Sequence, residues 1–598
     1  MISIYTYRKI TLILSILVFS CLQGFSQSKP LPKQLKGFDK FVEKELKKWN
    51  APGVSVAIVY DGEVILTKGY GYADVENKRK ADENTLFAIG SSSKAFTAAT
   101  VMQLVDDEKI ELDKPVRTYL PDFKLYTDEL SKNLTVRDLL THRSGLPRHD
   151  LVWYGSPFDR KELYERLQYL EPTEPLRQAW QYQNLMYMTA GYLVGELENT
   201  TWENYVVSEI FNPLKMSASN CSTNDMQKNP NHALPYKENE EEAIEKMDFR
   251  NIDNVGPAGS INSNAVDMAK WIKMLLNKGA ADDEILTEAS VQEMVKPQMI
   301  MPSNMSDEGD IFYTSYGLGW FITSYRGHLR VEHGGNIDGF TANVCIMPRD
   351  DFGVVVLTNQ NGSQLPSIIR NNVIDRLLEL EIKDWSKKIM EGIEKSKEAA
   401  DEDKEEEEDV IQKNDTKPSY ALDKYVGQYE HQGYGIITVS QKEKDLLHFK
   451  LNGIELDMEH YHFDVFKAKG SPLGDIKVQF VLDINGDIVS VQSKLEPTLD
   501  EFMVFKKMPK PVELNAADLE KYVGDFELMG QTIKFEVKDE KLMATVPGQP
   551  TYTLVPSGEH KFDLKGLKGY SVLFSVEADK ADKATFMQPN GNFTAKRK

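Results

Sequence analysis

The segment Ser91-Ser-Ser-Lys94 contains residue types that could carry out nucleophilic chemistry. It follows a strand-like run and a glycine, and it opens an apolar helical pattern. Residues at i and i+3 share one face of a helix, so the Lys94 amine can reach the Ser91 hydroxyl. A helix N-terminus also favours a developing negative charge through its free N–H groups. The segment therefore predicts a serine nucleophile, although a serine that only caps the helix is the alternative.

A second segment, Tyr182-Gln-Asn184, could supply part of the base that such a serine needs. An ammonium group cannot accept the serine proton, so Lys94 must be neutral at that moment or share the role. Alternate residues of an extended loop point the same way, so Tyr182 and Asn184 can line one site. Tyr182 would be a useful base if the charge of Lys94 lowered its pKa. The alternative is a buried tyrosine beside a capping asparagine.

A third segment, Glu332-His333-Gly-Gly-Asn336, follows a predicted strand over 329–331. Gly334 and Gly335 let the backbone approach a ligand closely, and a backbone N–H at this edge could complete an oxyanion hole with that of Ser91. His333 could donate a hydrogen bond to a substrate carboxylate or carbonyl, and the alternative is a structural histidine.

These segments need elements that bring them together, and the hydrophobic patterns predict such an arrangement. Strand-like patterns stand at both ends of the first 380 residues and long helical patterns between them, which predicts one sheet built from both ends with a helical lobe between. The predicted helices cover 36–49, several segments from 91 to 276, and one from about 366. The predicted strands are 54–59 and 63–67, joined by an Asp61-Gly62 turn, and 317–322, 329–332, 342–347 and 353–358.

The remainder of the chain has a different character. Residues 401–409 carry eight acids and one lysine, which is typical of a solvated helix that frays into a linker. Beyond it, Leu422-Asp-Lys-Tyr-Val-Gly recurs as Leu519-Glu-Lys-Tyr-Val-Gly, 97 positions later. Short alternating strands surround both copies, so we expect two similar antiparallel β modules. His460 and His462 could share a strand face as metal ligands, but no third ligand is evident and we expect exposed residues.

Composition and the first residues limit the partners and the compartment. The 598 residues carry a formal net charge of −21, which argues against nucleic acid, and three cysteines cannot form a disulfide scaffold. Arg8 and Lys9 precede a short apolar run and a polar stretch that ends near Gln27, so we expect a secretory signal over 1–27 and no membrane span. Lipidation of Cys21 is the less favoured alternative.

In order, Ser91/Lys94, Tyr182/Asn184 and His333/Gly334/Gly335 resemble the three motifs of the penicillin-recognising serine hydrolases. This group includes class C β-lactamases, D-alanyl-D-alanine carboxypeptidases, D-aminopeptidases and β-lactamase-like esterases. Its order is Ser-x-x-Lys, Tyr-x-Asn, then Lys or His followed by a variable residue and Gly. The resemblance covers residues 35–380 and includes three accessory stretches, 139–147, 257–263 and 316–320. The two C-terminal modules resemble lipocalin-like modules appended to some of these hydrolases.

The resemblance implies an acyl-enzyme on Ser91, with proton transfer shared by Lys94 and Tyr182. Asn184 would position the substrate or Lys94, and the backbone N–H groups of Ser91 and Asn336 would hold the oxyanion. No cofactor is implied. One departure stands out, because His333 replaces the usual lysine of β-lactamases and Gly334 replaces the usual hydroxyl residue. We therefore expect poor β-lactamase activity and a closer likeness to the peptidase and esterase members.

Together these observations predict an exported α+β serine hydrolase, periplasmic or extracellular, with an antiparallel sheet flanked by helices, a helical lobe and two small β modules. The expected substrate is a D-amino-acid or peptidoglycan-derived peptide or amide. The alternatives are a carboxylesterase on small acyl esters, a weak β-lactamase, and a silent penicillin-recognising binding protein. The predicted bounds are 1–27 for the leader, 28–383 for the hydrolase, 384–419 for the linker, and 420–509 and 510–598 for the modules.

Overall fold

The computed structural model describes residues 32–239, 241–302, 309–408, 412–471, 474–509, 514–567, 569–577, 579–589 and 591–598. The predicted leader and Cys21 lie outside these ranges. The chain divides into a first unit, residues 1–411 with 496–500, and a second unit, residues 412–495 with 501–598. Within the described ranges, no helix combines the length and the apolar character needed to cross a membrane.

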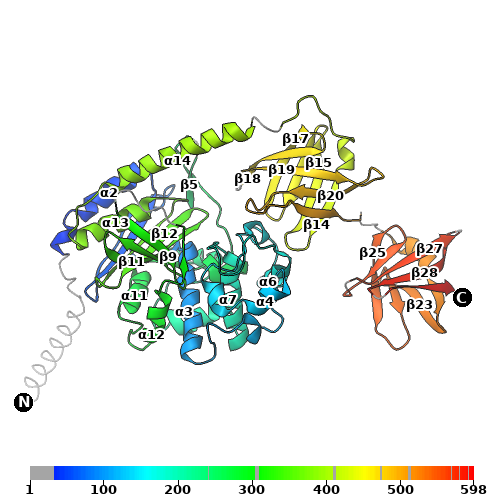
Figure 1. Cartoon of the computed structure of the whole chain (residues 1–598), viewed down its shortest axis with the longest axis horizontal. Helices are drawn as coiled ribbons and strands as arrows, with labels where there is room; N and C mark the ends of the chain where they lie inside the picture. The colour runs from blue at the N-terminus through cyan, green and yellow to red at the C-terminus, as the bar shows by residue number, and fades with distance from the viewer. Residues whose placement is uncertain are drawn as a thin grey trace, which may run out of the picture. The chain divides into compact units, whose positions relative to one another are not determined.

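The first unit is built on one antiparallel sheet of nine strands in the order β3-β2-β1-β13-β12-β11-β10-β9-β8 (Figure 1). Strand β1 pairs with β13, with Val54 opposite Thr358, so the two ends of the segment meet in the middle of the sheet as the sequence predicts. The strands are β1 Gly53–Tyr60, β2 Glu63–Asp74, β3 Arg79–Lys80, β8 Met299–Ile300, β9 Ile311–Tyr316, β10 Phe321–Tyr325, β11 His328–Ile337, β12 Phe340–Met347 and β13 Phe352–Thr358.

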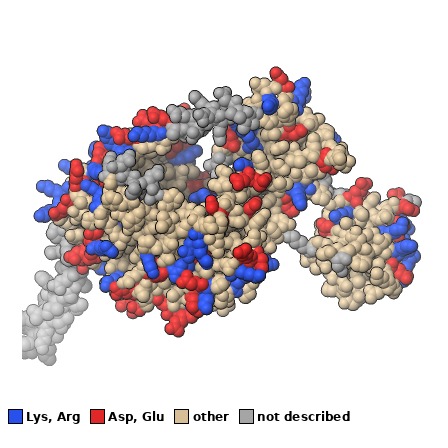
Figure 2. All heavy atoms as spheres, viewed as in Figure 1, with Lys and Arg blue, Asp and Glu red and all other residues tan. Residues whose placement is uncertain are grey.

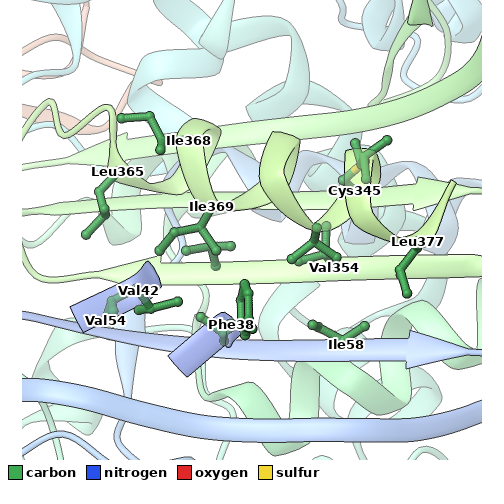
Figure 3. Close-up of a cluster of buried hydrophobic side chains, with 14 of the residues drawn as sticks. Phe38, Val42, Val54, Ile58, Cys345, Val354, Leu365, Ile368, Ile369 and Leu377 are labelled. Carbon is green, nitrogen blue, oxygen red and sulfur yellow. The ribbon is translucent and has the colours of Figure 1, made fainter. Parts of the chain in front are cut away.

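The two central strands are buried on both faces, which explains their nearly continuous apolar sequences. On one face Val54 and Ile58 of β1 pack with α2 (Phe38–Lys48) and α13 (Leu365–Leu377), as Figure 3 shows. Alternate residues point the other way, and there Gly353 faces Ile272 of α11 (Ala265–Leu276). This central sheet forms the rigid base for the strand β11 that carries the third motif.

The helical lobe lies in the sequence between β2 and β8, as predicted. Its longest helices, α3 (Ser93–Asp106) and α7 (Asn184–Glu198), begin at the first and second motifs. The shorter helices of the lobe are α4 Asp128–Asn133, α5 Val136–Leu140, α6 Arg160–Arg166, α8 Trp202–Val206, α9 Thr223–Met226, α10 Gly256–Gly259 and α12 Glu288–Met294. Two-stranded pairings join β4 (Phe87–Ala88) to β7 (Asn262–Ser263), and β5 (Tyr236–Glu238) to β6 (Ile244–Lys246).

Two strand predictions differ from the structure. The predicted strand 317–322 is a turn at its start, because Gly319 has a φ of +79° and lies against the backbone of Lys94, and the strands β9 and β10 flank that turn. The predicted strand 329–332 continues through the glycines, so His333, Gly334 and Gly335 belong to β11 rather than to a following loop. In β11 the third motif pairs with β12, with Gly335 opposite Ala342.

The second unit contains two closed barrels of eight strands each, β14–β21 and β22–β29. The repeated tyrosines Tyr425 and Tyr522 are both buried in these barrels and contact Phe466 and Phe562, respectively, which explains the sequence repeat. The first barrel has β14 Gly427–His431, β15 Gly435–Glu443, β16 Leu446–Leu451, β17 Ile454–His462, β18 Val465–Ser471, β19 Gly474–Leu482, β20 Ile488–Ser493 and β21 Met503–Lys507. The second has β22 Gly524–Leu528, β23 Gln531–Lys538, β24 Lys541–Thr545, β25 Thr551–Gly558, β26 Lys561–Leu564, β27 Ser571–Glu577, β28 Lys580–Gln588 and β29 Gly591–Arg597, and the short α15 Ala516–Leu519 precedes it.

The acidic segment forms the helix α14 (Trp385–Glu408), which begins with a buried tryptophan in the core of the first unit. Acidic and basic side chains are interspersed on the face of the molecule shown in Figure 2. Among the described residues no group of three His, Cys, Asp or Glu side chains could hold a metal ion. Cys221 and Cys345 are both buried free thiols.

Candidate active site

The Lys94 amine lies at the centre of the candidate site and contacts Ser91. Its Nζ is 3.1 Å from Ser91 Oγ, 2.8 Å from Asn184 Oδ1 and 2.7 Å from the carbonyl oxygen of Ala258. The Lys94 side chain is fully buried, and this burial lowers its pKa well below the usual value for lysine. A neutral amine has two N–H groups, which suit the two carbonyl oxygens, and one lone pair, which then faces the Ser91 hydroxyl. The first motif thus brings the Lys94 amine and the Ser91 hydroxyl within hydrogen-bond distance.

Ser91 stands in a short 3-10 turn, Gly90–Ser92, that leads directly into α3. Its neighbours fix this turn, because Ser92 Oγ donates to the carbonyl oxygen of His333 at 3.0 Å and Ser93 Oγ to that of Gly90 at 2.7 Å. Gly90 has a φ of +51°, which favours glycine. Ser91 itself is only partly buried, so a substrate can approach its hydroxyl.

Tyr182 lies beside Lys94, but its pKa does not meet the condition that the sequence analysis set for a useful base. The Lys94 Nζ is 4.7 Å from the centre of the Tyr182 ring. Burial raises the pKa of Tyr182 above the usual value, and a hydrogen bond with Ser91 and the charge of Arg148 oppose this effect only in part. The tyrosine is therefore a neutral phenol at ordinary pH.

Asn184, the first residue of α7, connects Lys94 to a carboxylate that the sequence analysis did not single out. Its Oδ1 accepts from Lys94, while its Nδ2 donates to Asp150 Oδ1 at 3.1 Å. The same Asp150 oxygen accepts from Trp153 Nε1 at 2.8 Å. These partners fix the amide orientation, so that the amide oxygen faces the amine.

The glycines of β11 bring its backbone against the turn that carries Ser91. A Cβ atom on Gly335 would lie 3.0 Å from the Ser91 amide nitrogen, and one on Gly90 would lie 2.8 Å from the Asn336 amide nitrogen. The two backbone N–H groups assigned to the oxyanion hole, those of Ser91 and Asn336, therefore come from adjacent segments. In contrast, a Cβ on Gly334 would meet only the Ala342 carbonyl oxygen, at 3.7 Å.

The structure places the His333 ring in the protein interior, with an exposed fraction of 1%. Its Nε2 is 2.9 Å from the Tyr316 hydroxyl, and its Nδ1 contacts the carbonyl oxygen of Gly334. Burial lowers the pKa of His333 to about 3, so the ring is neutral. Both ring nitrogens thus have protein partners, and a direct hydrogen bond to a substrate would require one of these contacts to break.

A second buried histidine, His142, packs against Tyr182 of the second motif. The ring centres of His142 and Tyr182 are 4.3 Å apart, and His142 Nδ1 accepts from the Gln183 backbone N–H at 3.1 Å. Burial lowers the pKa of His142 well below its usual value. His142 therefore orients the second motif without adding charge to the site.

Sequence reasoning missed three contributors to the site: the Ala258 carbonyl, Asp150 and Arg148. Ala258 and His142 lie in accessory stretches that the resemblance marks, and Arg148 and Asp150 follow one of those stretches directly. Composition and spacing could not assign a role to a backbone carbonyl or to a carboxylate that acts through another residue. A further interaction, the His149 backbone N–H donating to Glu496 Oε2 at 2.8 Å, joins residues far apart in sequence within the first unit.

Comparisons with known proteins give matches for both parts of the chain. A family model described as Beta-lactamase matches residues 38–378, and one described as a domain of unknown function (DUF3471) matches residues 412–507. The chain is 30% identical over 430 residues, 69% of its length and 79% of the relative's, to Unguisins hydrolase ungD' of Aspergillus campestris. It is 27% identical over 339 residues, 56% of its length and 64% of the relative's, to Protein flp of Staphylococcus aureus strain MRSA252. A solved octameric penicillin-binding protein homologue from Pyrococcus abyssi has a TM-score of 0.54 at 21% identity, over 79% of this chain and 99% of that one.

Proposed function

Since the chain belongs to the beta-lactamase family of serine hydrolases, we propose that it hydrolyses an amide or peptide bond through an acyl-enzyme on Ser91. The observation that carries this proposal is the buried Lys94 amine, 3.1 Å from Ser91 Oγ, with a pKa well below that of an ordinary lysine. A neutral amine at this distance can accept the serine proton without a separate histidine base.

In the proposed acylation, Ser91 Oγ forms a bond with the substrate carbonyl carbon as its proton passes to Lys94. The backbone N–H groups of Ser91 and Asn336 stabilise the negative charge on the carbonyl oxygen. Collapse of the tetrahedral intermediate breaks the bond to the leaving group, which needs a proton. The Tyr182 hydroxyl, hydrogen-bonded to Ser91, passes that proton on from Lys94. Water then releases the acyl group by the same steps in reverse order.

The substrate class proposed first is a D-amino-acid or peptidoglycan-derived peptide or amide. It is supported by the His-Gly-Gly form of the third motif, which resembles the peptidase and esterase members more than the β-lactamases. The neutral, buried His333 provides no fixed positive charge for the carboxylate of a β-lactam, so we expect poor β-lactamase activity. A carboxylesterase on small acyl esters is the second candidate, because the same acyl chemistry acts on esters.

The remaining alternative is a penicillin-recognising binding protein that has lost catalysis. The intact contacts of Lys94 with Ser91 and Asn184 argue against it, since a silent protein would not need to keep a buried amine with a lowered pKa beside the serine. We also propose that residues 1–27 direct export to the periplasm or the exterior, which the mass of the mature N-terminus would test.

The experiment that tests the substrate class is a comparison of kcat/KM on the purified full-length chain. The panel contains D-aminoacyl amides, a D-Ala-D-Ala peptide, their L-isomers, p-nitrophenyl esters and nitrocefin. We expect the D-configured amides and peptides to be turned over best, with all activity lost in Ser91→Ala. Turnover of the esters alone would favour the esterase, and efficient turnover of nitrocefin that depends on Ser91 would contradict the predicted weak β-lactamase.

A further inference from the structure

The candidate site lacks the permanent cation that the third motif provides in many family members. His333 stands at that position, and its ring is buried and neutral. Lys94 is also buried, and its proposed role requires the neutral form. Arg250, whose Nε donates to Asp338 Oδ2 at 2.9 Å, packs against Tyr154 and not against the Tyr182 ring beside Lys94. A substrate with a negative charge therefore needs another cation.

Arg148 lies against the Tyr182 ring and follows the accessory stretch 139–147 immediately in sequence. Its guanidinium carbon is 5.1 Å from the centre of the Tyr182 ring, and 54% of its side chain is exposed. On the same ring, Lys94 Nζ stands 4.7 Å from the centre. The Tyr182 ring thus contacts one cation that is buried and titratable and another that is exposed and permanent.

A single carboxylate fixes the guanidinium in place. Arg148 Nε donates to Asp150 Oδ2 at 2.6 Å, and Asp150 Oδ1 is occupied by Asn184 and Trp153. This contact uses only Nε, and the two terminal nitrogens of Arg148 have no hydrogen-bond acceptor among the described residues. An arginine held by Nε presents its terminal N–H groups in a planar fork that matches a carboxylate.

The charge of Arg148 also reaches the catalytic residues. Burial is the main cause of the lowered pKa of Lys94, and the positive charge of Arg148 lowers it further; the same charge opposes the burial effect on the pKa of Tyr182. An anion bound at Arg148 would therefore lie within electrostatic range of the nucleophile's base.

We propose that Arg148 is a specificity-determining residue that binds a carboxylate of the substrate near the scissile bond. The proposal rests on the proposed serine hydrolase function and narrows its substrate class to acyl compounds that carry such a carboxylate. Arg148 provides the positive charge that His333 lacks. Asp150 holds Arg148 in place through Nε and leaves its two terminal nitrogens available to the substrate. A purely structural arginine, which only orients Asp150, would give no preference for charge.

The experiment measures reversible inhibition with a matched pair of arylboronic acids, which form an adduct with a serine nucleophile and need no knowledge of the natural substrate. The probes are 3-carboxyphenylboronic acid and its neutral isostere, 3-carbamoylphenylboronic acid. Each Ki is obtained from protection against labelling by a fluorophosphonate. The proteins are the full-length wild type, Arg148→Gln, Arg148→Lys and Arg349→Gln, where Arg349 is an exposed arginine in the turn after β12.

We expect the wild type and Arg349→Gln to bind the carboxylate probe about tenfold or more tightly than the amide, as a charge-assisted pair should. Arg148→Gln should bring the ratio close to one, because any effect of the lost charge on Lys94 changes the Ki of both probes alike. Arg148→Lys should keep part of the preference. Two results overturn the assignment of Arg148. One is a preference for the carboxylate probe that persists in Arg148→Gln. The other is a wild type that reacts with fluorophosphonate but does not prefer the carboxylate probe. A wild type that does not react with fluorophosphonate overturns the serine hydrolase itself.

Discussion

Gly335 of β11 lies directly against the backbone of Ser91, since a Cβ atom at residue 335 would overlap the Ile89 carbonyl oxygen and lie 3.0 Å from the Ser91 amide nitrogen. The absence of a side chain thus lets β11 bring the Asn336 N–H beside that of Ser91. We expect Gly335→Ala to separate the two donors and to lower kcat about 100-fold or more, the usual effect of losing an oxyanion-hole donor. Steady-state kinetics on any accepted substrate would measure this.

The neighbouring glycine provides the control for that prediction. A Cβ on Gly334 would meet only the Ala342 carbonyl oxygen at an ordinary 3.7 Å, so Gly334→Ala should keep the thermal midpoint and most of the activity. Equal kinetic losses in the two variants would argue that the close approach of Gly335 has no special role.

Lys94→Met tests the assignment of the base. Methionine fills the buried space but cannot accept a proton, so we expect kcat/KM to fall by about 100- to 10,000-fold, the range for loss of a general base. The exposed Lys124 offers the matched control, Lys124→Met, which should behave as the wild type. Retention of activity in Lys94→Met would assign the base elsewhere.

The pH dependence follows from the lowered pKa of Lys94. Only the neutral amine accepts the serine proton, so kcat/KM should rise with pH as Lys94 deprotonates and then level off well below the usual lysine pKa near ~10.4. His333 and His142 are already neutral in this range because burial lowers both of their pKa values. A rate that continues to rise up to the pKa of an ordinary lysine would contradict this assignment.

Asp150→Asn should shift the pH range over which kcat/KM rises, which we call the acid limb, in a predictable direction. The negative charge of Asp150 favours the ammonium form and so raises the pKa of Lys94. Asparagine keeps a side-chain oxygen for Asn184 but removes the charge, so the limb should shift to lower pH. A shift to higher pH, in a variant with the wild-type melting temperature, would refute the electrostatic coupling between Asp150 and Lys94.

The sequence predicted the parts of this molecule that depend on local patterns. The Asp61-Gly62 hairpin, the helix that begins after Ser91 and the repeated Tyr425 and Tyr522 all have signals within a few residues, and the structure confirms them. The strand predicted at 317–322 was wrong at its start because Gly319 forms a turn against Lys94, a tertiary contact that no local pattern encodes.

The same distinction applies to the site. The pairing of Ser91 with Lys94 follows from helical spacing, whereas the roles of Asp150 and Arg148 depend on contacts between segments distant in sequence. The sequence argument made Tyr182 a base only on the condition that a cation lowered its pKa. Burial outweighs the nearby charges and raises that pKa instead, and burial cannot be read from a three-residue motif.

The central claim is that Ser91 is an activated nucleophile, and the most direct test is covalent labelling of the full-length chain with a fluorophosphonate followed by intact-mass and peptide mapping. We expect a single adduct on Ser91 in the wild type, a much slower reaction in Lys94→Met, and no adduct in Ser91→Ala. An unlabelled wild type, or an adduct that persists in Ser91→Ala, would contradict the claim.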